Sequence, residues 1–169
     1  EAMKELACNG VQVVLTYPNN DAGGLSIIEK LEAVNKLGIR DIHLHRSLGR
    51  HLYHGVLALA ENSSIRIACV GNSSSGLKET PAFHCPAVNI GSRQQGRLRG
   101  DNVMNVGYSS TEIKTAVERC LFNEDFRAAC REAKNPYWLG GAGAKVAKIL
   151  SETSLTQGLL RKKTTLRAV

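Results

Sequence analysis

Short apolar runs alternate along the chain with longer stretches in which apolar residues recur at helical spacing. The short runs are rich in β-branched residues and predict strands at residues 11–16, 39–44, 65–70, 86–90 and 103–106. The longer stretches predict helices at residues 22–37, 50–62, 76–83, 109–121, 123–133 and 143–151. Such regular alternation favours a parallel sheet with right-handed connections and helices on both faces. We therefore expect an α/β, Rossmann-like fold.

The organisation of the chain predicts one domain followed by a short tail. Its 169 residues are enough to bury a core, and no internal repeat or low-complexity linker divides them. We assign residues 1–154 to the domain and residues 155–169 to a basic tail, which carries four Lys and Arg residues. The first residues have the pattern of a helix interior, which suggests a domain taken from a longer protein.

The chain carries 22 basic and 15 acidic residues, a formal charge of +7. Nucleic-acid phosphates would explain this excess, and so would a small anionic ligand or a basic surface with a basic tail. Aromatic residues make up only 5% of the chain, and none alternate with basic residues as a base-stacking surface requires. We therefore expect no nucleic-acid partner. No run of about 18 apolar residues is present, so we expect no membrane span either.

The cysteines do not indicate a disulfide framework or a zinc site. All five (Cys8, Cys69, Cys85, Cys120 and Cys130) stand outside any CxxC pair. Zinc sites and disulfide frameworks use closer, even-numbered spacing. We expect free thiols that serve as small core residues in a reduced, cytoplasmic protein.

The histidines do not predict a metal site. His43 and His45 alternate on one strand, while His51 and His54 share a helix face. Neither pair comes with a carboxylate or a third ligand at metal spacing. We expect no metal and no other cofactor, and we find no Ser-His-Asp order and no pair of catalytic carboxylates.

Ligands of parallel α/β sheets bind beyond the carboxyl ends of the strands, where the loop at residues 71–76 lies. Its sequence, Gly-Asn-Ser-Ser-Ser-Gly, brings hydroxyls and free amides to a helix start, which favours a phosphate. The alternative is plain helix capping by serine. A capping box places Glu three residues after the capping serine, whereas Glu79 lies four after Ser75. Glu79 is therefore available to a ligand, for instance to ribose hydroxyls, and the spacing leaves both interpretations open.

The loop at residues 91–100 holds three arginines between glycines. A guanidinium forms forked hydrogen bonds with phosphate oxygens. We predict a ligand contact for Arg93, which is nearest the strand end. For Arg97 and Arg99 a solvated surface position is the better interpretation.

The loop at residues 17–24 follows the first predicted strand. Asn and Asp in such loops often build the turn and cap the next helix, which fits Asp21. Asn19 is the better candidate for a ligand contact.

Taken together, these loops resemble one enzyme family. The chain carries the family's motifs in the family's order: Tyr-Pro-Asn-Asn-Asp-Ala-Gly-Gly (17–24), Ser-Leu-Gly (47–49), Gly-Asn-Ser-Ser-Ser-Gly (71–76), Val-Asn-Ile-Gly-Ser-Arg-Gln-Gln-Gly-Arg (88–97) and Asp-Asn-Val (101–103). They look like the C-terminal half of the hydrolysing UDP-N-acetylglucosamine 2-epimerases of the sialic-acid type. The resemblance spans about residues 11–150, and the serine and arginine loops in tandem are its specific part.

The resemblance implies the C-terminal domain of a GT-B fold, in which two Rossmann-like domains enclose the substrate. The residues that it assigns to UDP binding are Asn19, Leu48, Ser73, Ser74, Glu79 and Arg93. Among these, Ser73 and Ser74 would bind phosphate, Glu79 would bind the ribose, and the turn that contains Leu48 would lie near the uracil.

The family's reaction removes the C2 proton of the sugar and expels UDP, and water then adds to the resulting glycal with inverted configuration at C2. The resemblance implies conversion of UDP-N-acetylglucosamine to N-acetylmannosamine and UDP in sialic-acid-type sugar biosynthesis. It also implies a homo-oligomer, and an N-terminal Rossmann-like domain that supplies the catalytic carboxylates and histidine. This chain would then bind the UDP-sugar's nucleotide weakly on its own and turn nothing over.

Two other functions fit the same fold. A GT-B glycosyltransferase donor domain would also bind UDP but would pass the sugar to an acceptor, and a non-catalytic module would only bind a nucleotide sugar. The serine loop with Glu79 and the Gly-Ser-Arg-Gln loop favour the epimerase. The chain departs from the family's pattern at His84-Cys85, at Trp138-Leu139 and in a longer segment at 61–66, where we expect an altered turn between helix and strand.

Overall fold

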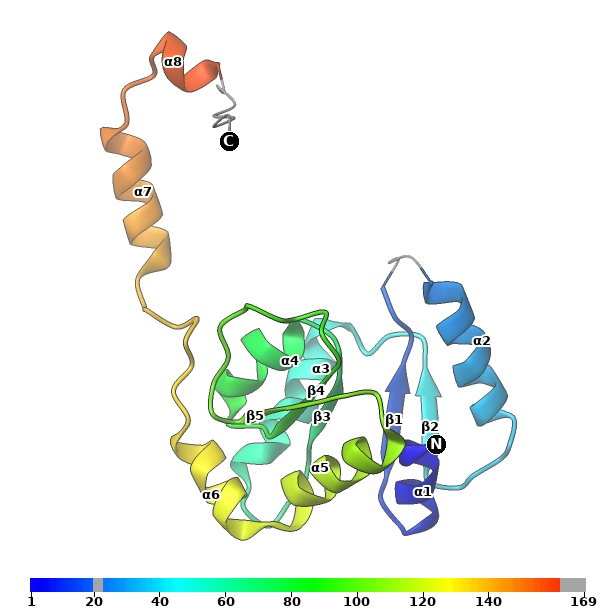
Figure 1. Cartoon of the computed structure of the whole chain (residues 1–169). Coiled ribbons are helices and arrows are strands. Elements are labelled where there is room, and N and C mark those ends of the chain that lie inside the picture. Colours follow the sequence, from blue (N-terminus) through cyan, green and yellow to red (C-terminus); the bar gives the residue numbers. More distant parts are fainter. Residues whose placement is uncertain (20–22, 162–169) are drawn as a thin grey trace, which may run out of the picture. The chain divides into compact units, whose positions relative to one another are not determined.

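The computed structural model describes residues 1–19 and 23–161. The chain divides into two compact units, Glu1–Tyr137 and Trp138–Val169, and the first unit contains all the described strands (Figure 1). The elements are α1 (Ala2–Cys8), β1 (Val13–Thr16), α2 (Gly24–Asn35), β2 (Ile42–His45), α3 (Gly49–Ala58), η1 (Leu59–Glu61), β3 (Cys69–Gly71), α4 (Ser75–Lys78), η2 (Thr80–Phe83), β4 (Ala87–Ile90), β5 (Val103–Val106), α5 (Ser110–Phe122), α6 (Glu124–Glu132), α7 (Ala142–Glu152) and α8 (Gln157–Leu160). The predicted domain boundary at residue 154 stays a prediction.

Parallel strands form the centre of the first unit. β1 pairs with β2, with Val13 opposite Ile42, and β4 lies between β3 and β5 with Asn89 opposite both Gly71 and Asn105. Because every pair is parallel, the carboxyl ends of the strands in each sheet lie at one edge. The loops after β3 and β4 therefore begin side by side.

The sequence pattern predicted one sheet, whereas the described strands form two, with the orders β1-β2 and β3-β4-β5. The strand predicted at residues 65–70 is shortened to Cys69–Gly71. Arg127 of α6, which is only 7% exposed, donates through Nη2 to the carbonyl oxygens of Ser63 and Ile65, at 2.8 and 2.9 Å. These contacts hold the segment before β3 against α6, so these two carbonyl oxygens are not available to a neighbouring strand.

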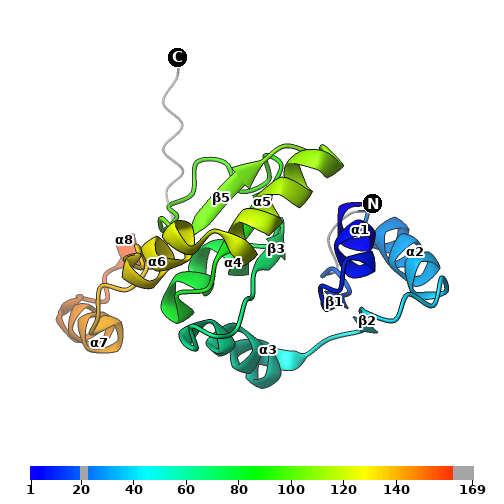
Figure 2. The same cartoon turned by 90° about the horizontal axis from the view of Figure 1, so that it is seen from below.

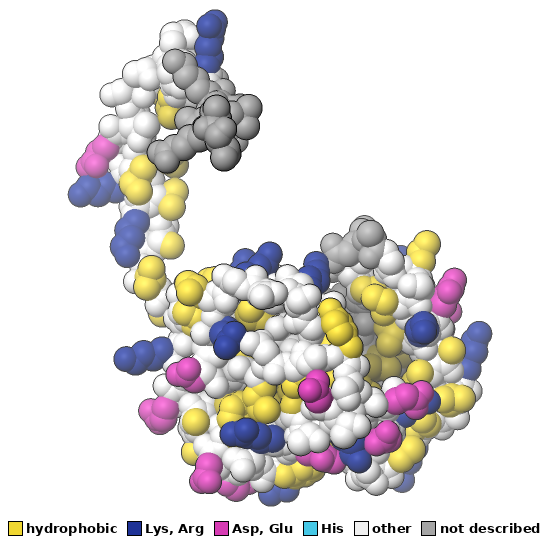
Figure 3. All heavy atoms as spheres, in the orientation of Figure 1, with side chains coloured by type: hydrophobic (Ala, Val, Ile, Leu, Met, Phe, Trp, Pro, Cys, Tyr) yellow, Lys and Arg dark blue, Asp and Glu magenta, His cyan; other side chains and the backbone are white. Residues whose placement is uncertain are grey.

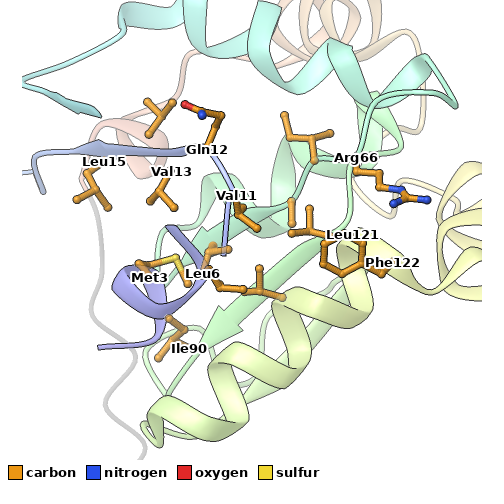
Figure 4. Close-up of a pocket in the computed structure, with 16 residues that line it drawn as sticks. Met3, Leu6, Val11, Gln12, Val13, Leu15, Arg66, Ile90, Leu121 and Phe122 are labelled. Atoms are coloured by element: carbon orange, nitrogen blue, oxygen red, sulfur yellow. The ribbon is translucent and has the colours of Figure 1, made fainter. Parts of the chain in front are cut away.

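A cavity of about 530 Å³ lies where β1 and β3 would meet in a single sheet. Its walls come from α1, β1, the segment before β3, β4 and α5, and they are mainly apolar. Figure 4 shows Leu6, Val13, Ile90 and Leu121 around it, with Arg66 at one side. None of the residues predicted to bind UDP lines this cavity.

Helices cover both faces of the three-stranded sheet (Figure 2). α5 packs on the face that carries Val88, where a buried cluster includes Leu6 of α1 and Val117 of α5. α4 packs on the opposite face, where Leu77 contacts Ala87 and Val103. Ala87 and Val88 are consecutive in β4, so their side chains point to opposite faces of the sheet. This arrangement confirms the predicted α/β, Rossmann-like class.

The second unit consists of α7 and α8 with their connecting segments. Every side chain described in this unit is exposed, including the apolar Val146, Ile149 and Leu150 of α7. α7 matches the helix predicted at residues 143–151 to within one residue at each end. Most of the basic residues of the predicted tail lie outside the described residues.

The structure shows where the charged side chains and the cysteines of the first unit lie. On the face shown in Figure 3, Lys and Arg side chains of the first unit are scattered among acidic and neutral ones. Within residues 1–19 and 23–161, no helix is both long and apolar enough to cross a membrane. All five cysteines are free, and Cys85, Cys120 and Cys130 are buried, as expected for core thiols, whereas Cys8 is exposed.

Candidate functional site

The loop after β3 forms a tight turn into the short helix α4. Ser74 is the N-cap residue of α4, but its hydroxyl makes no capping hydrogen bond. The Ser73 hydroxyl accepts a hydrogen bond from the N–H of Ser75, at 3.3 Å. Within the described part of the chain, no acceptor binds the main-chain N–H of Ser73 or Ser74. The turn therefore presents two amide donors and the Ser74 hydroxyl to a ligand, while Ser73 does part of the capping.

The loop after β4 is tied to this turn through Asn72. Arg93 donates through Nη1 to the Asn72 carbonyl oxygen at 3.2 Å, and the buried Gln94 donates through Nε2 to the same oxygen at 2.7 Å. The turn at Gly91, where φ is +73°, directs the chain into this approach. The structure thus brings Arg93 next to the serine turn (residues 71–76), although the two are far apart in the sequence.

Tyr108 covers the start of the arginine loop. Its hydroxyl accepts a hydrogen bond from the N–H of Ser92 at 3.4 Å. Hydrogen bonding to the Ser92 side chain, followed by this backbone bond, lowers the pKa of Tyr108. The ring lies so close to Gly91 that an added Cβ would be 2.4 Å from it. A glycine is therefore required at this position for the tyrosine to pack as it does.

Glu79 lies at the end of α4, and its carboxylate contacts α3. The oxygen Oε2 is 2.6 Å from Nε2 of His54. The neighbouring residue of α3, Tyr53, is hydrogen-bonded to the Ser75 hydroxyl, and burial raises the pKa of Tyr53. Two consecutive residues of α3 thus fix both ends of α4.

The remaining two predicted residues lie in the loops of the other sheet. Asn19 is exposed after β1, and Leu48 is the partly exposed N-cap residue of α3, after β2. Among the described residues, no hydrogen bond or ion pair joins either of them to the serine turn. Asp21, which was expected to build the turn or cap α2, lies outside the described residues.

Three residues of this region were not predicted from the sequence as part of the site: His54, Tyr53 and Gln94. The spacing of the histidines predicts no carboxylate beside His54, because Glu79 comes from another element 25 residues away. Gln94 is part of the arginine motif, but only the structure reveals that it is buried and bound to Asn72. No sequence spacing signals contacts of this kind.

The arrangement provides donors for an anion beside an acceptor for hydroxyls. Amide N–H groups and a guanidinium are suited to phosphate oxygens, and a carboxylate is suited to accept from sugar hydroxyls. Within residues 1–19 and 23–161, no group of three or more His, Cys, Asp or Glu side chains is placed to hold a metal ion.

Comparison with known proteins shows which family the chain matches. Residues 1–151 match the family described as UDP-N-acetylglucosamine 2-epimerase. A GDP/UDP-N,N'-diacetylbacillosamine 2-epimerase (hydrolyzing) of Campylobacter jejuni is 37% identical over 93 residues, which are 55% of this chain and 23% of that protein. A UDP-N,N'-diacetylbacillosamine 2-epimerase (hydrolyzing) of Legionella pneumophila is 36% identical over 118 residues, 69% of this chain and 28% of that protein.

A third relative, a UDP-N-acetylglucosamine 2-epimerase of Neisseria meningitidis, is 29% identical over 125 residues, 74% of this chain and 31% of that protein. The chain thus matches less than a third of the length of each of these three relatives. The family expected from the serine and arginine loops is confirmed by the match over residues 1–151. The chain belongs to the UDP-N-acetylglucosamine 2-epimerase family.

Proposed function

We propose that this chain is the UDP-binding half of a hydrolysing UDP-sugar 2-epimerase. The reaction converts a UDP-linked 2-acetamido sugar and water into the free sugar with inverted C2 and UDP. UDP-N-acetylglucosamine, which would yield N-acetylmannosamine, is the substrate that the sequence motifs favour. The names of the Campylobacter and Legionella relatives favour UDP-N,N'-diacetylbacillosamine as the second candidate.

The observation that carries the proposal is the contact of Arg93 and Gln94 with the Asn72 carbonyl oxygen. It brings a guanidinium next to a turn in which the main-chain N–H groups of Ser73 and Ser74 have no acceptor among the described residues. Both loops leave the carboxyl ends of adjacent parallel strands, where ligands of such sheets bind. A diphosphate is the ligand that best matches this set of donors.

The same donors would assist departure of UDP. When the bond between the anomeric carbon and the phosphate oxygen breaks, its electron pair stays with the diphosphate, whose negative charge increases. Donors already fixed toward that position stabilise the charge without having to reorganise. In this proposal Ser73, Ser74 and Arg93 bind the diphosphate and Glu79 binds the ribose. Asn19 and the turn at Leu48 would complete the nucleotide site from the side of β1 and β2.

Proton removal at C2 requires groups beyond those described here. We assign these groups to an N-terminal Rossmann-like domain that faces this one. We also propose that the enzyme is a homo-oligomer. Since the chain matches less than a third of its relatives' length, we expect it to bind UDP without catalysing turnover.

The nucleotide site can be tested by calorimetry on the 169-residue chain with UDP and with uridine. UDP should bind at least about 10-fold more tightly, because hydrogen bonds to a charged group contribute roughly 1.5–3 kcal/mol. Equal affinity for the two compounds would contradict a diphosphate site.

The reaction can be tested with a chimera in which this chain replaces the matching segment of the Neisseria relative. With UDP-N-acetylglucosamine, the chimera should release free N-acetylmannosamine and UDP, which mass spectrometry distinguishes from a UDP-linked product. An exclusively UDP-linked epimer would indicate a non-hydrolysing epimerase. Transfer of the sugar to an added acceptor would indicate a glycosyltransferase.

A further inference from the structure

His54 lies on α3 and is bound to the carboxylate of Glu79, which belongs to the proposed nucleotide site. Its Nε2 is 2.6 Å from Oε2 of Glu79, and the two side chains are 35% and 40% exposed. The carboxylate can only accept, so the imidazole donates this hydrogen bond. Phe83 packs beside the histidine, with ring centroids 5.2 Å apart. The pair is therefore partly shielded from water.

The helix that carries His54 is itself held in place. Tyr53 is hydrogen-bonded to the Ser75 hydroxyl and lies 3.6 Å from Sγ of Cys69, which belongs to β3. Tyr53 also packs against a buried cluster that includes Leu57 and Cys85. α3 therefore has a fixed position relative to α4, and the imidazole of His54 approaches Glu79 from a rigid support.

The contact with His54 occupies Oε2 of Glu79 and leaves Oε1 available to a ligand. Within residues 1–19 and 23–161, Oε1 of Glu79 has no hydrogen bond. A free glutamate side chain loses rotamer entropy when a ligand immobilises it. A histidine that already immobilises it removes much of that loss at the moment of binding.

We propose that His54 is a positioning residue for nucleotide binding: it holds Glu79 so that the second carboxylate oxygen accepts a hydrogen bond from the 2'-hydroxyl of the ribose. The proposal rests on the proposed function, because it needs a nucleotide at the serine turn. Glu79 follows Ser74 by five residues, a rise of about 7.5 Å along a helix, which is the scale of a ribosyl phosphate. His54 thereby contributes to selectivity for ribose over 2'-deoxyribose without touching the ligand.

Calorimetry with UDP and 2'-deoxy-UDP tests this on the whole chain and on its variants. The wild type should prefer UDP by about 10-fold, as expected when a carboxylate accepts from one hydroxyl. Glu79→Gln should reduce this preference to less than about 3-fold. His54→Leu should do the same while leaving the affinity for 2'-deoxy-UDP nearly unchanged, and in the double variant the two effects should not add.

Two further variants separate positioning from folding. His54→Gln retains a donor and should recover part of the preference for UDP. His51→Leu, an exposed histidine of the same helix, should leave the preference as it is in the wild type. Circular dichroism identifies any variant that fails to fold. If His54→Leu fails to fold, the preferences of His54→Gln and Glu79→Gln for UDP are compared instead.

The outcomes distinguish the two proposals. If His54→Leu weakens both ligands equally, or leaves the preference for UDP intact, the positioning role is overturned while the UDP site stands. If the wild type binds UDP but does not prefer it over 2'-deoxy-UDP, the ribose contact of Glu79 is overturned. If the wild type binds neither ligand, the proposed function fails, and the role of His54 fails with it.

Discussion

Arg93 donates through Nη1 to the main-chain carbonyl oxygen of Asn72, 3.2 Å away, although 21 residues separate them in the sequence. Asn72 directly precedes the serine turn, so this contact fixes the distance between the guanidinium and the amide groups of that turn. Gln94 donates to the same oxygen, so two side chains of one loop bind Asn72. A charged group held in this way is organised before a ligand arrives.

Substitution of Arg93 by alanine should weaken UDP binding by roughly 1.5–3 kcal/mol, the usual contribution of a hydrogen bond to a charged group. Arg93→Lys should recover only part of this, because an ammonium group cannot form the forked pair of hydrogen bonds. Calorimetry with UDP measures both changes. Arg97→Ala is the matched control, since Arg97 is an exposed arginine of the same loop. Equal losses for Arg93→Ala and Arg97→Ala would indicate a general effect of charge.

The sequence pattern predicted the fold class well where elements depend on local periodicity. The strand expected at residues 103–106 is β5 without any change of bounds, and α5 is displaced by one residue at each end. The division into two sheets was not predictable from periodicity, and neither were the hydrogen bonds from Arg127 of α6 to the carbonyl oxygens of Ser63 and Ile65 before β3. The longer segment at 61–66 indicated an altered turn between helix and strand, but it did not indicate that the strands would form two sheets.

The candidate site was predictable to a similar degree. Placement after strands identified the loops that carry Ser74, Glu79 and Arg93, because parallel strands bring their carboxyl ends together. The partner of Glu79 could not be found in this way. His54 reaches it from a different helix, and nothing in the spacing of the histidines distinguishes His54 from the exposed His51.

Arg127→Met should lower the free energy of unfolding by roughly 2–4 kcal/mol. The arginine is 7% exposed, forms two hydrogen bonds with the carboxylate of Glu124, and satisfies two carbonyl oxygens before β3. Loss of a buried charged donor leaves its acceptors unsatisfied, which is the expensive part of the change. Urea unfolding followed by circular dichroism measures the difference.

Arg131→Met is the control for this prediction, because Arg131 is an exposed arginine of the same helix. It should change the free energy of unfolding by less than about 0.5 kcal/mol, as is usual at exposed positions. If the two variants are equally stable, the contacts of Arg127 do not stabilise the segment before β3.

Gly91→Ala should destabilise the first unit by about 1–3 kcal/mol, and Gly96→Ala by about 1 kcal/mol. Both glycines have positive φ values, +73° and +80°, which an L-residue adopts at a cost of roughly 1–2 kcal/mol. Only at Gly91 would the new Cβ meet a neighbour, the ring of Tyr108 at 2.4 Å. The difference between the two variants in urea unfolding therefore isolates the displacement of Tyr108. A difference of zero would mean that Tyr108 moves aside without penalty.

Stability should fall as the pH rises above about 9, because the buried thiols must stay protonated in the folded state. Cys120 is fully buried, and burial raises the pKa of its thiol from 9.0 to about 12. Burial also raises the pKa of Cys69 and Cys85. A folded-state pKa above the unfolded one favours folding fully below the unfolded pKa, and this contribution is lost as the pH rises toward the folded pKa. The window is therefore about pH 9 to 12 for Cys120.

Cys120→Ala removes one of these thiols and should make the decline shallower by up to about 1.4 kcal/mol per pH unit, the value for one proton. The measurement is the free energy of unfolding in urea between pH 8 and about pH 10.5, under reducing conditions. The slope is the informative quantity, because the alanine also leaves a small cavity that lowers stability equally at every pH. Cys8→Ala removes an exposed thiol, which water reaches in both states, and should leave the slope unchanged. If Cys120→Ala and Cys8→Ala have the same slope as the wild type, the alkaline loss of stability does not come from the buried Cys120 thiol.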